Sequence, residues 1–142
     1  MADAVTKERF EQMGGRDMLV RVNKSFYDKM YAHPWLSKYF EHVEQEYIEM
    51  QQTNFMQATL GGDNIYGGKT PVFAHTRIKI TEELFVEREK LLKEALEEVG
   101  ASQPLVNAWL NLDVKFKPAI IKKSEQMEKS SPFGPLMDFP KP

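Results

Sequence analysis

The chain has 142 residues, enough for one domain with a sizeable core, and its 42% hydrophobic and 28% charged residues are typical of a globular protein. A net charge of −2 with both signs interspersed argues against a nucleic-acid partner, and the lack of cysteine excludes disulfides and thiolate metal sites. The N-terminus lacks an apolar signal core and no apolar run reaches membrane-spanning length, so we expect a soluble, cytoplasmic protein.

Apolar residues recur every three or four positions in the first half of the chain, which predicts helices. A short helix over 7–12 ends at a glycine pair, and a longer helix spans 16–32. The residue before Pro34 disfavours helical geometry, so the second helix ends there and a turn of helix follows over 35–40. A third helix over 44–60 ends at another glycine pair, because glycine accepts the left-handed C-cap conformation.

The second half of the chain opens with a glycine-containing loop over 63–69 and a short helix that carries His75. Thr81, followed by two glutamates, is a typical N-cap for a helix that ends at Gly100. Ser102 is expected to cap the last helix in the same way. These elements contain no strand pattern and no repeat, so the sequence predicts an all-α fold.

The C-terminal part of the sequence departs from this regular pattern. Pro118 lies within the last helix and is expected to kink or interrupt it. Residues 124–142 are polar and hold half of the chain's eight prolines. We therefore expect a helical domain over 1–123, followed by an irregular or mobile extension over 124–142.

His75 is the best-placed side chain to hold a metal or a metal-bearing cofactor. It is one of only three histidines and follows apolar residues near the start of a helical pattern. A neutral imidazole in such a setting is what an axial haem ligand requires. The alternative is an ordinary core or surface histidine, and one residue alone does not decide between them. The sequence offers no nucleophile–base–orienter set and no phosphate-binding glycine motif.

Two polar residues, Tyr27 and Gln52, lie on or beside apolar helix faces. A buried hydroxyl or amide costs a few kcal/mol unless it bonds a partner, water or a ligand. In a slot between helices both could therefore bind a small polar ligand, with Phe26, Phe40 and Phe55 as apolar walls. Ordinary packing of Tyr27 and a surface position for Gln52 are the alternatives.

Five short motifs, in this order and at these intervals, resemble the truncated haemoglobins, most closely those of group I. They are Met13-Gly14-Gly15, Phe26-Tyr27-Asp28, Tyr39-Phe40, Leu60-Gly61-Gly62 with Tyr66 and Gly68, and Ala74-His75-Thr76-Arg77 with Ile80, Thr81 and Phe85. Each motif is weak alone, but together they are specific and cover about residues 8–121. The resemblance implies a two-over-two helical sandwich that binds one haem b.

The resemblance also implies which residues form the site. His75 becomes the proximal iron ligand, and Tyr27 and Gln52 become the distal pair that donates hydrogen bonds to bound dioxygen and would serve any catalysis. Tyr66 and Arg77 are candidates for contacts with the haem propionates. The remaining residues expected to contact the haem are Phe26, Phe40, Ile48, Phe55, Phe85 and Arg88.

Arg88 departs from the family's pattern, which has an apolar residue or a tryptophan at this position. A buried cation must be paired, so Arg88 is expected to reach a propionate, Gln52 or the bound ligand, or else to extend to solvent on its aliphatic stem. Gln51 stands where some relatives carry an iron-coordinating histidine. We therefore expect ferric iron to hold water, hydroxide or the Tyr27 phenolate, unless His42, expected in a surface loop, reaches it.

Three functions are compatible with these residues. The first is binding of diatomic gases (dioxygen, nitric oxide, carbon monoxide) with redox turnover, such as conversion of nitric oxide to nitrate or a peroxidase-like reaction. Since the sequence holds no flavin or nicotinamide motif, a separate reductase would re-reduce the iron. The second is a haem-based gas or redox sensor whose tail over 124–142 contacts a partner. The third is a helical interaction module without haem.

Overall fold

The computed structural model describes residues 4–66, 80–125, 130–131, 134–135, 139 and 141–142. Its helices are α1 (Ala4–Gln12), α2 (Gly15–Ala32), the 3-10 helix η1 (Leu36–Phe40), α3 (Gln45–Thr59), α5 (Glu82–Glu98) and α6 (Gln103–Glu125). Two two-residue strands, β1 (Ser130–Ser131) and β2 (Gly134–Pro135), pair antiparallel near the end of the chain. Apart from this pairing, which the sequence did not predict, the regular structure of the described residues is helical.

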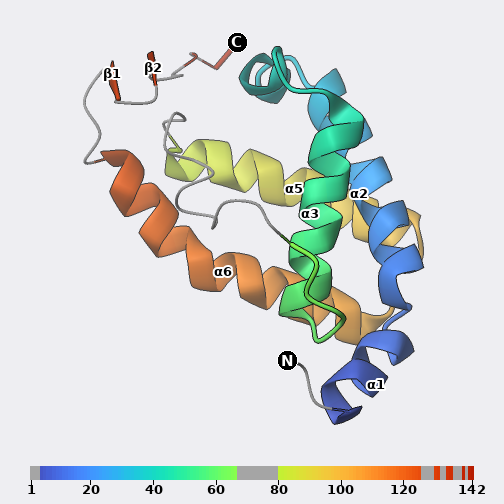
Figure 1. The fold of residues 1–142 in the computed structure, drawn as a ribbon. Helices are drawn as coiled ribbons and strands as arrows, with labels where there is room; N and C mark the ends of the chain where they lie inside the picture. The colour runs from blue at the N-terminus through green and yellow to red at the C-terminus, as the bar shows by residue number, and fades with distance from the viewer. Residues whose placement is uncertain (1–3, 67–79, 126–129, 132–133, 136–138, 140) are drawn as a thin grey trace.

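The long helices form two antiparallel pairs that cross each other (Figure 1). Helix α2 runs beside α3 in one pair, α5 runs beside α6 in the other, and α2 also packs against α5. The core lies where the pairs cross, because the apolar faces of α2, α5 and α6 meet there. Its most completely buried apolar side chains include Leu19, Val22, Phe26, Leu92, Leu96, Leu105 and Trp109.

Local signals fix where the helices begin and end, as the sequence predicted. The Thr81 hydroxyl accepts a hydrogen bond from the Leu84 N–H at 3.1 Å at the start of α5. Ser102 accepts in the same way from the Leu105 N–H at 3.4 Å. Gly14, between α1 and α2, has a φ of 107°, and a Cβ there would lie 2.6 Å from the Met18 side chain. A larger residue at this turn would therefore be both strained and crowded.

Of the two effects expected of Pro118, a kink or an interruption of the last helix, the structure contradicts the interruption. Helix α6 continues through Pro118 to Glu125. Proline removes one backbone N–H, which leaves the carbonyl of Val114 without its helical partner. Both residues are exposed, so water can bind that carbonyl and the cost of the break is lower than in the core.

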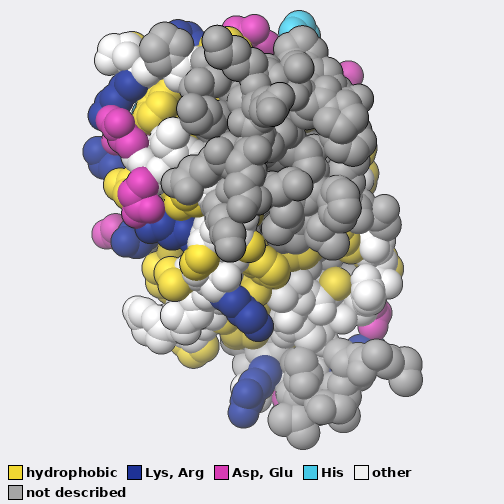
Figure 2. Space-filling view, turned by 90° about the vertical axis from the view of Figure 1, so that its left-hand side faces the viewer, with side chains coloured by type: hydrophobic (Ala, Val, Ile, Leu, Met, Phe, Trp, Pro, Cys, Tyr) yellow, Lys and Arg dark blue, Asp and Glu magenta, His cyan; other side chains and the backbone are white. Residues whose placement is uncertain are grey.

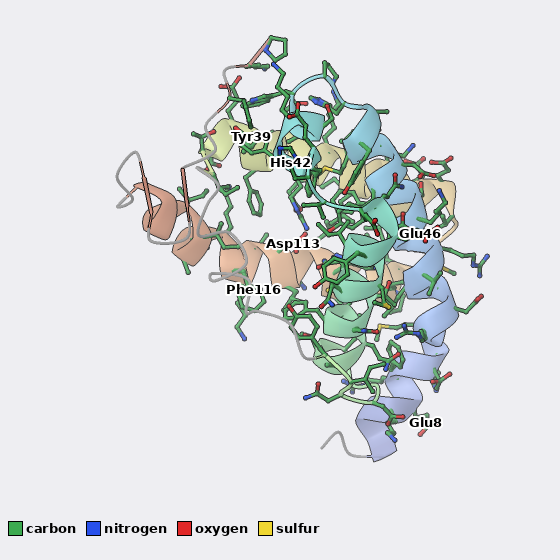
Figure 3. The ribbon with its side chains drawn as sticks, turned by 45° about the horizontal axis from the view of Figure 1, so that its top comes forward. Glu8, Tyr39, His42, Glu46, Asp113 and Phe116 are labelled. Carbon is green, nitrogen blue, oxygen red and sulfur yellow. The ribbon has the colours of Figure 1, made fainter. Side chains whose placement is uncertain are left out.

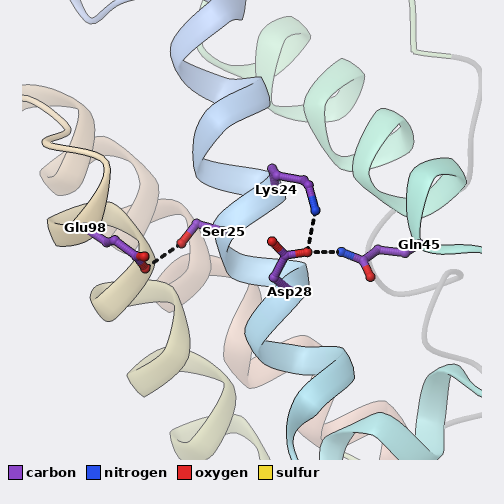
Figure 4. A network of polar contacts seen from close by, with 5 residues as sticks. All are labelled: Lys24, Ser25, Asp28, Gln45 and Glu98. Carbon is purple, nitrogen blue, oxygen red and sulfur yellow. Dashed lines mark hydrogen bonds and ion pairs between the residues drawn. The ribbon is translucent and has the colours of Figure 1, made fainter.

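Polar contacts fasten α2 to both of its neighbours (Figure 4). The Asp28 carboxylate accepts hydrogen bonds from Lys24, at 2.7 Å, and from Gln45 at the start of α3. The hydrogen bond from Lys24 is the main reason that the pKa of Asp28 is lowered. On the other side, the Ser25 hydroxyl donates to Glu98 of α5 at 2.9 Å. The contacts of Asp28 with Gln45 and of Ser25 with Glu98 thus join α2, which carries part of the site described below, to α3 and α5.

The described end of the chain packs onto η1 and α5. The Trp35 indole donates to the Phe139 carbonyl at 2.7 Å, and the Phe139 N–H donates to the Tyr39 hydroxyl at 3.1 Å. The two rings of Phe139 and Tyr39 meet edge to face, with centroids 5.0 Å apart. Lys141 pairs with Glu83 at 2.9 Å. The division of the chain at residue 123 stays a prediction.

The described surface carries mixed charge. On the described part of the face in Figure 2, Lys and Arg side chains lie close to Asp and Glu side chains. This agrees with the interspersed charges of the sequence. Among the helices of the described residues, none combines the length and the apolar character that crossing a membrane requires.

Candidate functional site

A cavity of about 240 Å³ lies between the two helix pairs. Its wall is mostly apolar, and it contains the aromatic side chains of Tyr27, Tyr39, Phe40, Phe55, Tyr66, Phe85 and Phe116. Four polar or charged side chains with an amide, guanidinium or carboxylate also line it: Gln51, Gln52, Arg88 and Asp113. Since α2, η1, α3, α5 and α6 each contribute, the cavity exists only in the assembled fold.

The aromatic side chains of the wall support one another. The rings of Tyr27 and Phe40 meet edge to face with centroids 6.1 Å apart, and Phe40 stacks on Tyr31 at 5.3 Å. On the α3 side, Phe55 contacts Tyr66 edge to face at 5.3 Å and Phe116 at 6.2 Å. Such pairs prefer fixed geometries, so the wall offers flat and well-positioned apolar surface to a ligand.

Tyr27 places a hydroxyl in this apolar wall. Its side chain is buried, with 6% of its surface exposed, and the hydroxyl has no hydrogen-bond partner within the described part of the chain. Burial raises the pKa of Tyr27, and the nearby Arg88 charge only partly opposes this. The hydroxyl therefore keeps its proton, and burial disfavours the phenolate considered above. A buried donor of this kind fits a ligand that accepts a hydrogen bond.

Gln52 also lies where a ligand in the cavity could reach it. It projects from α3 into the cavity wall beside Gln51, and both side chains are half-buried. Neither amide makes a hydrogen bond to another of the described residues. The structure thus brings Tyr27 and Gln52 to the same cavity from two different helices, as the resemblance implied.

Arg88 is paired with two carboxylates and not with Gln52, the one expected partner among the described residues. Its Nη1 atom donates to Asp113 of α6 at 2.8 Å and to the adjacent Glu89. The guanidinium carbon also lies 5.1 Å from the ring centroid of Phe26 and 5.9 Å from that of Phe85. With 22% of the side chain exposed, Arg88 does not extend freely to solvent. It is a cation held inside the fold by two carboxylates and two rings.

Asp113 and Glu89 are residues of this site that were not selected from the sequence. Asp113 follows Trp109 by four residues and so falls on the inner stripe of α6, an unusual place for a carboxylate. A carboxylate on this stripe could have been predicted to pair with Arg88, the unusual cation on the apolar face of α5. Figure 3 shows Asp113 and Phe116 on the side of α6 that faces α3, across the cavity they line.

The other predicted site residues divide into three groups. Those that line the cavity are Phe40, Ile48, Phe55, Tyr66 and Phe85. Phe26 does not line it: the side chain is completely buried behind Tyr27, with ring centroids 4.9 Å apart. Tyr27 thus lies between the Phe26 ring and the cavity. His75 and Arg77 lie outside the described residues.

The two described histidines lie away from the cavity wall. His42 is exposed in the turn after η1, as its expected surface position implied. The His33 Nδ1 atom accepts hydrogen bonds from the N–H groups of Trp35 and Leu36, both at 3.1 Å. His33 therefore organises the break between α2 and η1, which is a structural role.

Comparison with known proteins identifies the fold. Residues 8–121 match the family model of the bacterial-like globins. This chain belongs to the bacterial-like globin family. The globin is 30% identical to a group 1 truncated haemoglobin of Tetrahymena thermophila, over 68% of this chain and 80% of that protein. It is 28% identical to the group 1 truncated haemoglobin of Tetrahymena pyriformis, over 69% and 81% of the two chains.

Solved structures agree with this membership. The 2/2 haemoglobin of Synechococcus sp. PCC 7002, solved in the cyanomet state with covalently attached haem, superposes with a TM-score of 0.72. It is 21% identical to this globin and covers 80% of it, while the globin covers 97% of that chain. The predicted all-α, two-over-two helical sandwich is therefore confirmed.

Membership in the family also decides the cofactor. Globins hold a haem iron at which diatomic gases bind, so the expected haem iron and the general function of ligand binding are confirmed. The cavity fits such a group, because its ring-lined wall suits a flat apolar molecule. A helical module without haem is no longer a competing explanation.

Proposed function

We propose that this globin binds dioxygen and related diatomic ligands in the cavity, with Tyr27 and Gln52 as the hydrogen-bonding pair and His75 as the iron ligand. The observation that carries the proposal is the Tyr27 side chain, which is buried while its hydroxyl opens onto the cavity and makes no hydrogen bond to another described residue. A ligand in the cavity that accepts this hydrogen bond gives the hydroxyl a partner.

Haem iron supplies the position at which a diatomic molecule binds and an electron that can be exchanged with it. The protein's own contribution is to hold donors at that position. Tyr27 stays protonated because burial raises its pKa, so it can donate throughout the physiological pH range. A hydrogen bond to a ligand that carries partial negative charge is worth about 1.5–3 kcal/mol, or roughly ten- to a hundred-fold in ligand escape. The amide of Gln52 adds a second donor.

The apolar walls of the cavity are proposed to hold the haem itself. Phe40, Ile48, Phe55 and Phe85 line the cavity and present only carbon to it. Tyr66, whose ring packs on Phe55, and Arg77 are the proposed propionate contacts. Because Arg88 is already paired with two carboxylates, we propose that it forms part of the cavity wall and does not bind a propionate.

The reaction proposed for this site is the conversion of nitric oxide to nitrate. One nitric oxide and one dioxygen combine into nitrate when one electron is added, and a separate reductase is proposed to supply that electron. Mixing the oxygenated globin with nitric oxide and measuring nitrate tests the reaction. Stoichiometric nitrate is expected, with faster consumption than in Tyr27→Phe. Release of dioxygen with no nitrate formed would contradict it.

The role of His75 has its own test. Absorption spectra of the ferric, ferrous and carbonyl forms, compared between the wild type and His75→Ala, report the iron ligand directly. We expect the alanine variant to lose or strongly alter the spectrum, while His42→Ala leaves it unchanged. A bis-histidine spectrum that disappears in His42→Ala would show that the proposed ligand set is wrong.

A further inference from the structure

Two carboxylates meet at a single nitrogen atom in the wall of the cavity. The Nη1 atom of Arg88 contacts Asp113 on α6, at 2.8 Å, and Glu89 on α5. Only 12% of the Asp113 side chain and 15% of the Glu89 side chain are exposed. The family's pattern does not require this arrangement, because Arg88 replaces a residue that is usually uncharged.

The charges of this cluster do not balance when every group is ionised. One guanidinium then faces two carboxylates, and an excess negative charge remains in a place with little access to water. Acids that lie this close in such a setting keep a proton between them, because two adjacent charges cannot both be compensated. Burial and the hydrogen bond with Asp113 raise the pKa of Glu89, whereas Arg88 opposes the rise.

We propose that Glu89, which shares the Arg88 Nη1 atom with Asp113, holds a proton at neutral pH, and that this proton controls the affinity of the cavity for negatively charged ligands. The inference rests on the proposed function in one respect, namely that the cavity is where the ligand binds. Arg88 and Asp113 line the cavity, and Glu89 lies behind them. With the proton present the cluster is neutral and Arg88 can attract an anion. Without it, the excess negative charge repels the anion.

The other titratable and charged groups near the cluster in the described structure do not account for this pH dependence. From α2, Tyr27 faces Arg88 and remains neutral, because burial raises its pKa. From α3, Glu49 acts on Tyr27 and makes no contact with the cluster in the described structure. On α6, Lys117 lies 5.4 Å from the ring of Phe85, and its ion pair is with Glu82.

The proton can be observed directly in the carbonyl form of the holoprotein. We would label Glu and Asp carboxyl carbons with ¹³C and follow their NMR shifts from about pH 6 to about pH 9.5. The Glu89 signal, assigned by its absence in Glu89→Gln, should titrate in the upper half of this range. In Asp113→Asn its midpoint should fall, because the neighbouring acid is gone. A Glu89 carboxyl that is ionised throughout in the wild type would overturn the proposal.

The effect of the Glu89 proton on ligand binding is tested with two probes, the anion azide and the neutral molecule carbon monoxide. Between about pH 6 and about pH 9, azide affinity of the ferric wild type should fall about tenfold more than that of Glu89→Gln. Ionisation of iron-bound water affects both proteins, so their difference isolates the cluster. The ferrous wild type and ferrous Glu89→Gln should have the same carbon monoxide affinity. Glu97→Gln, a change at an exposed glutamate, is the control variant and should show the azide profile of the wild type.

Identical azide profiles in the wild type and Glu89→Gln would overturn the link between the proton and anion binding. This outcome differs from failure of the proposed function. If Tyr27→Phe left dioxygen binding unchanged while Glu89 titrated as described, the distal role of Tyr27 would be wrong and the proton pair would stand.

Discussion

Arg88 is the side chain on which most of the site's electrostatics depend. A guanidinium loses hydration when it enters an apolar wall, and burial alone would lower its pKa. The carboxylates of Asp113 and Glu89 reverse this effect, so the pKa of Arg88 is raised and the cation persists. The rings of Phe26 and Phe85 cover the guanidinium faces. The charge is therefore retained inside the fold by specific partners.

Removing one partner should expose the cost of this charge. In Asp113→Ala, Arg88 keeps only Glu89 as a carboxylate partner and loses one charged hydrogen bond, so we expect the free energy of unfolding in urea to fall by about 1.5–3 kcal/mol. The double variant Arg88→Met, Asp113→Ala should recover most of that loss, because no cation then remains buried. Equal stability of the wild type and the single variant would mean that the pair contributes little.

Glu89 should make the stability of the protein depend on pH. Burial raises its pKa in the folded chain from the ordinary 4.5 to about 8, so the folded state binds the proton more tightly than the unfolded state. Its contribution is complete below about pH 4.5 and is lost as the pH rises through about 8. Unfolding in urea at several pH values should show this decline, and Glu89→Gln should flatten it. Parallel pH profiles of the two proteins would be the contrary result.

These side chains also show how far a sequence can predict a site. Tyr27 was identified because a polar residue on an apolar helix face needs an explanation, and that signal is local. The partner of Arg88 was missed because Asp113 lies 25 positions away and meets it only because α5 and α6 pack side by side. The exclusion of Phe26 from the cavity depends on its packing against Tyr27 and Arg88, which a spacing pattern does not resolve.

At the scale of the helices, α2 and α3 are joined by a hydrogen bond inside the core. The Asn23 amide donates to the Thr53 hydroxyl at 2.9 Å, and both side chains are buried. The two helices are therefore aligned by a directional contact as well as by apolar packing. Since α2 carries Tyr27 and α3 carries Gln52, this bond helps to keep the two side chains of the proposed distal pair together.

Thr53→Val tests that contact with little change in side-chain shape. It leaves the Asn23 amide without this partner, so we expect a loss of about 1–3 kcal/mol in the free energy of unfolding. Thr59→Val, at the exposed end of the same helix, is the matched control and should have little effect. If the two variants behaved alike, the buried hydrogen bond would not stabilise the pair.

The bounds of the helices were predictable because their causes are local. Glycine pairs, the residue before Pro34, and the hydroxyls of Thr81 and Ser102 each act within a few residues. Pro118 was misjudged because its effect depends on exposure, which the sequence does not state. On an exposed face the missing hydrogen bond costs less, and α6 continues.

At the scale of the whole molecule, this two-over-two globin has a contact between its C-terminal end and the region of η1. Phe139 lies beyond the family match at residues 8–121, yet it contacts Trp35 and Tyr39. Because Tyr39 lines the cavity, the end of the chain supports the cavity wall from behind. This contact joins residues 100 positions apart and has no local signature in the sequence. A described tail residue that packs on its own chain does not favour a sensor that acts through that tail.

Phe139→Ala should therefore affect both stability and the cavity. Loss of the ring from Tyr39 is expected to lower the free energy of unfolding by about 1–3 kcal/mol and to speed haem loss from the holoprotein. Transfer of haem to an acceptor globin measures the second effect. Lys141→Ala removes only an exposed ion pair and is the control, expected to match the wild type. If Phe139→Ala lost haem at the wild-type rate, the contact of the chain end with Tyr39 would not support the cavity.

The role of Tyr27 is tested most directly by the dissociation rate of dioxygen from the ferrous globin. Tyr27→Phe removes the hydroxyl and keeps the ring that packs on Phe40. We predict that dioxygen leaves roughly ten- to a hundred-fold faster from this variant, because a hydrogen bond worth about 1.5–3 kcal/mol is lost. Carbon monoxide, a weaker hydrogen-bond acceptor, should change much less. A dioxygen dissociation rate equal to that of the wild type would contradict the assignment of Tyr27 as the ligand's donor.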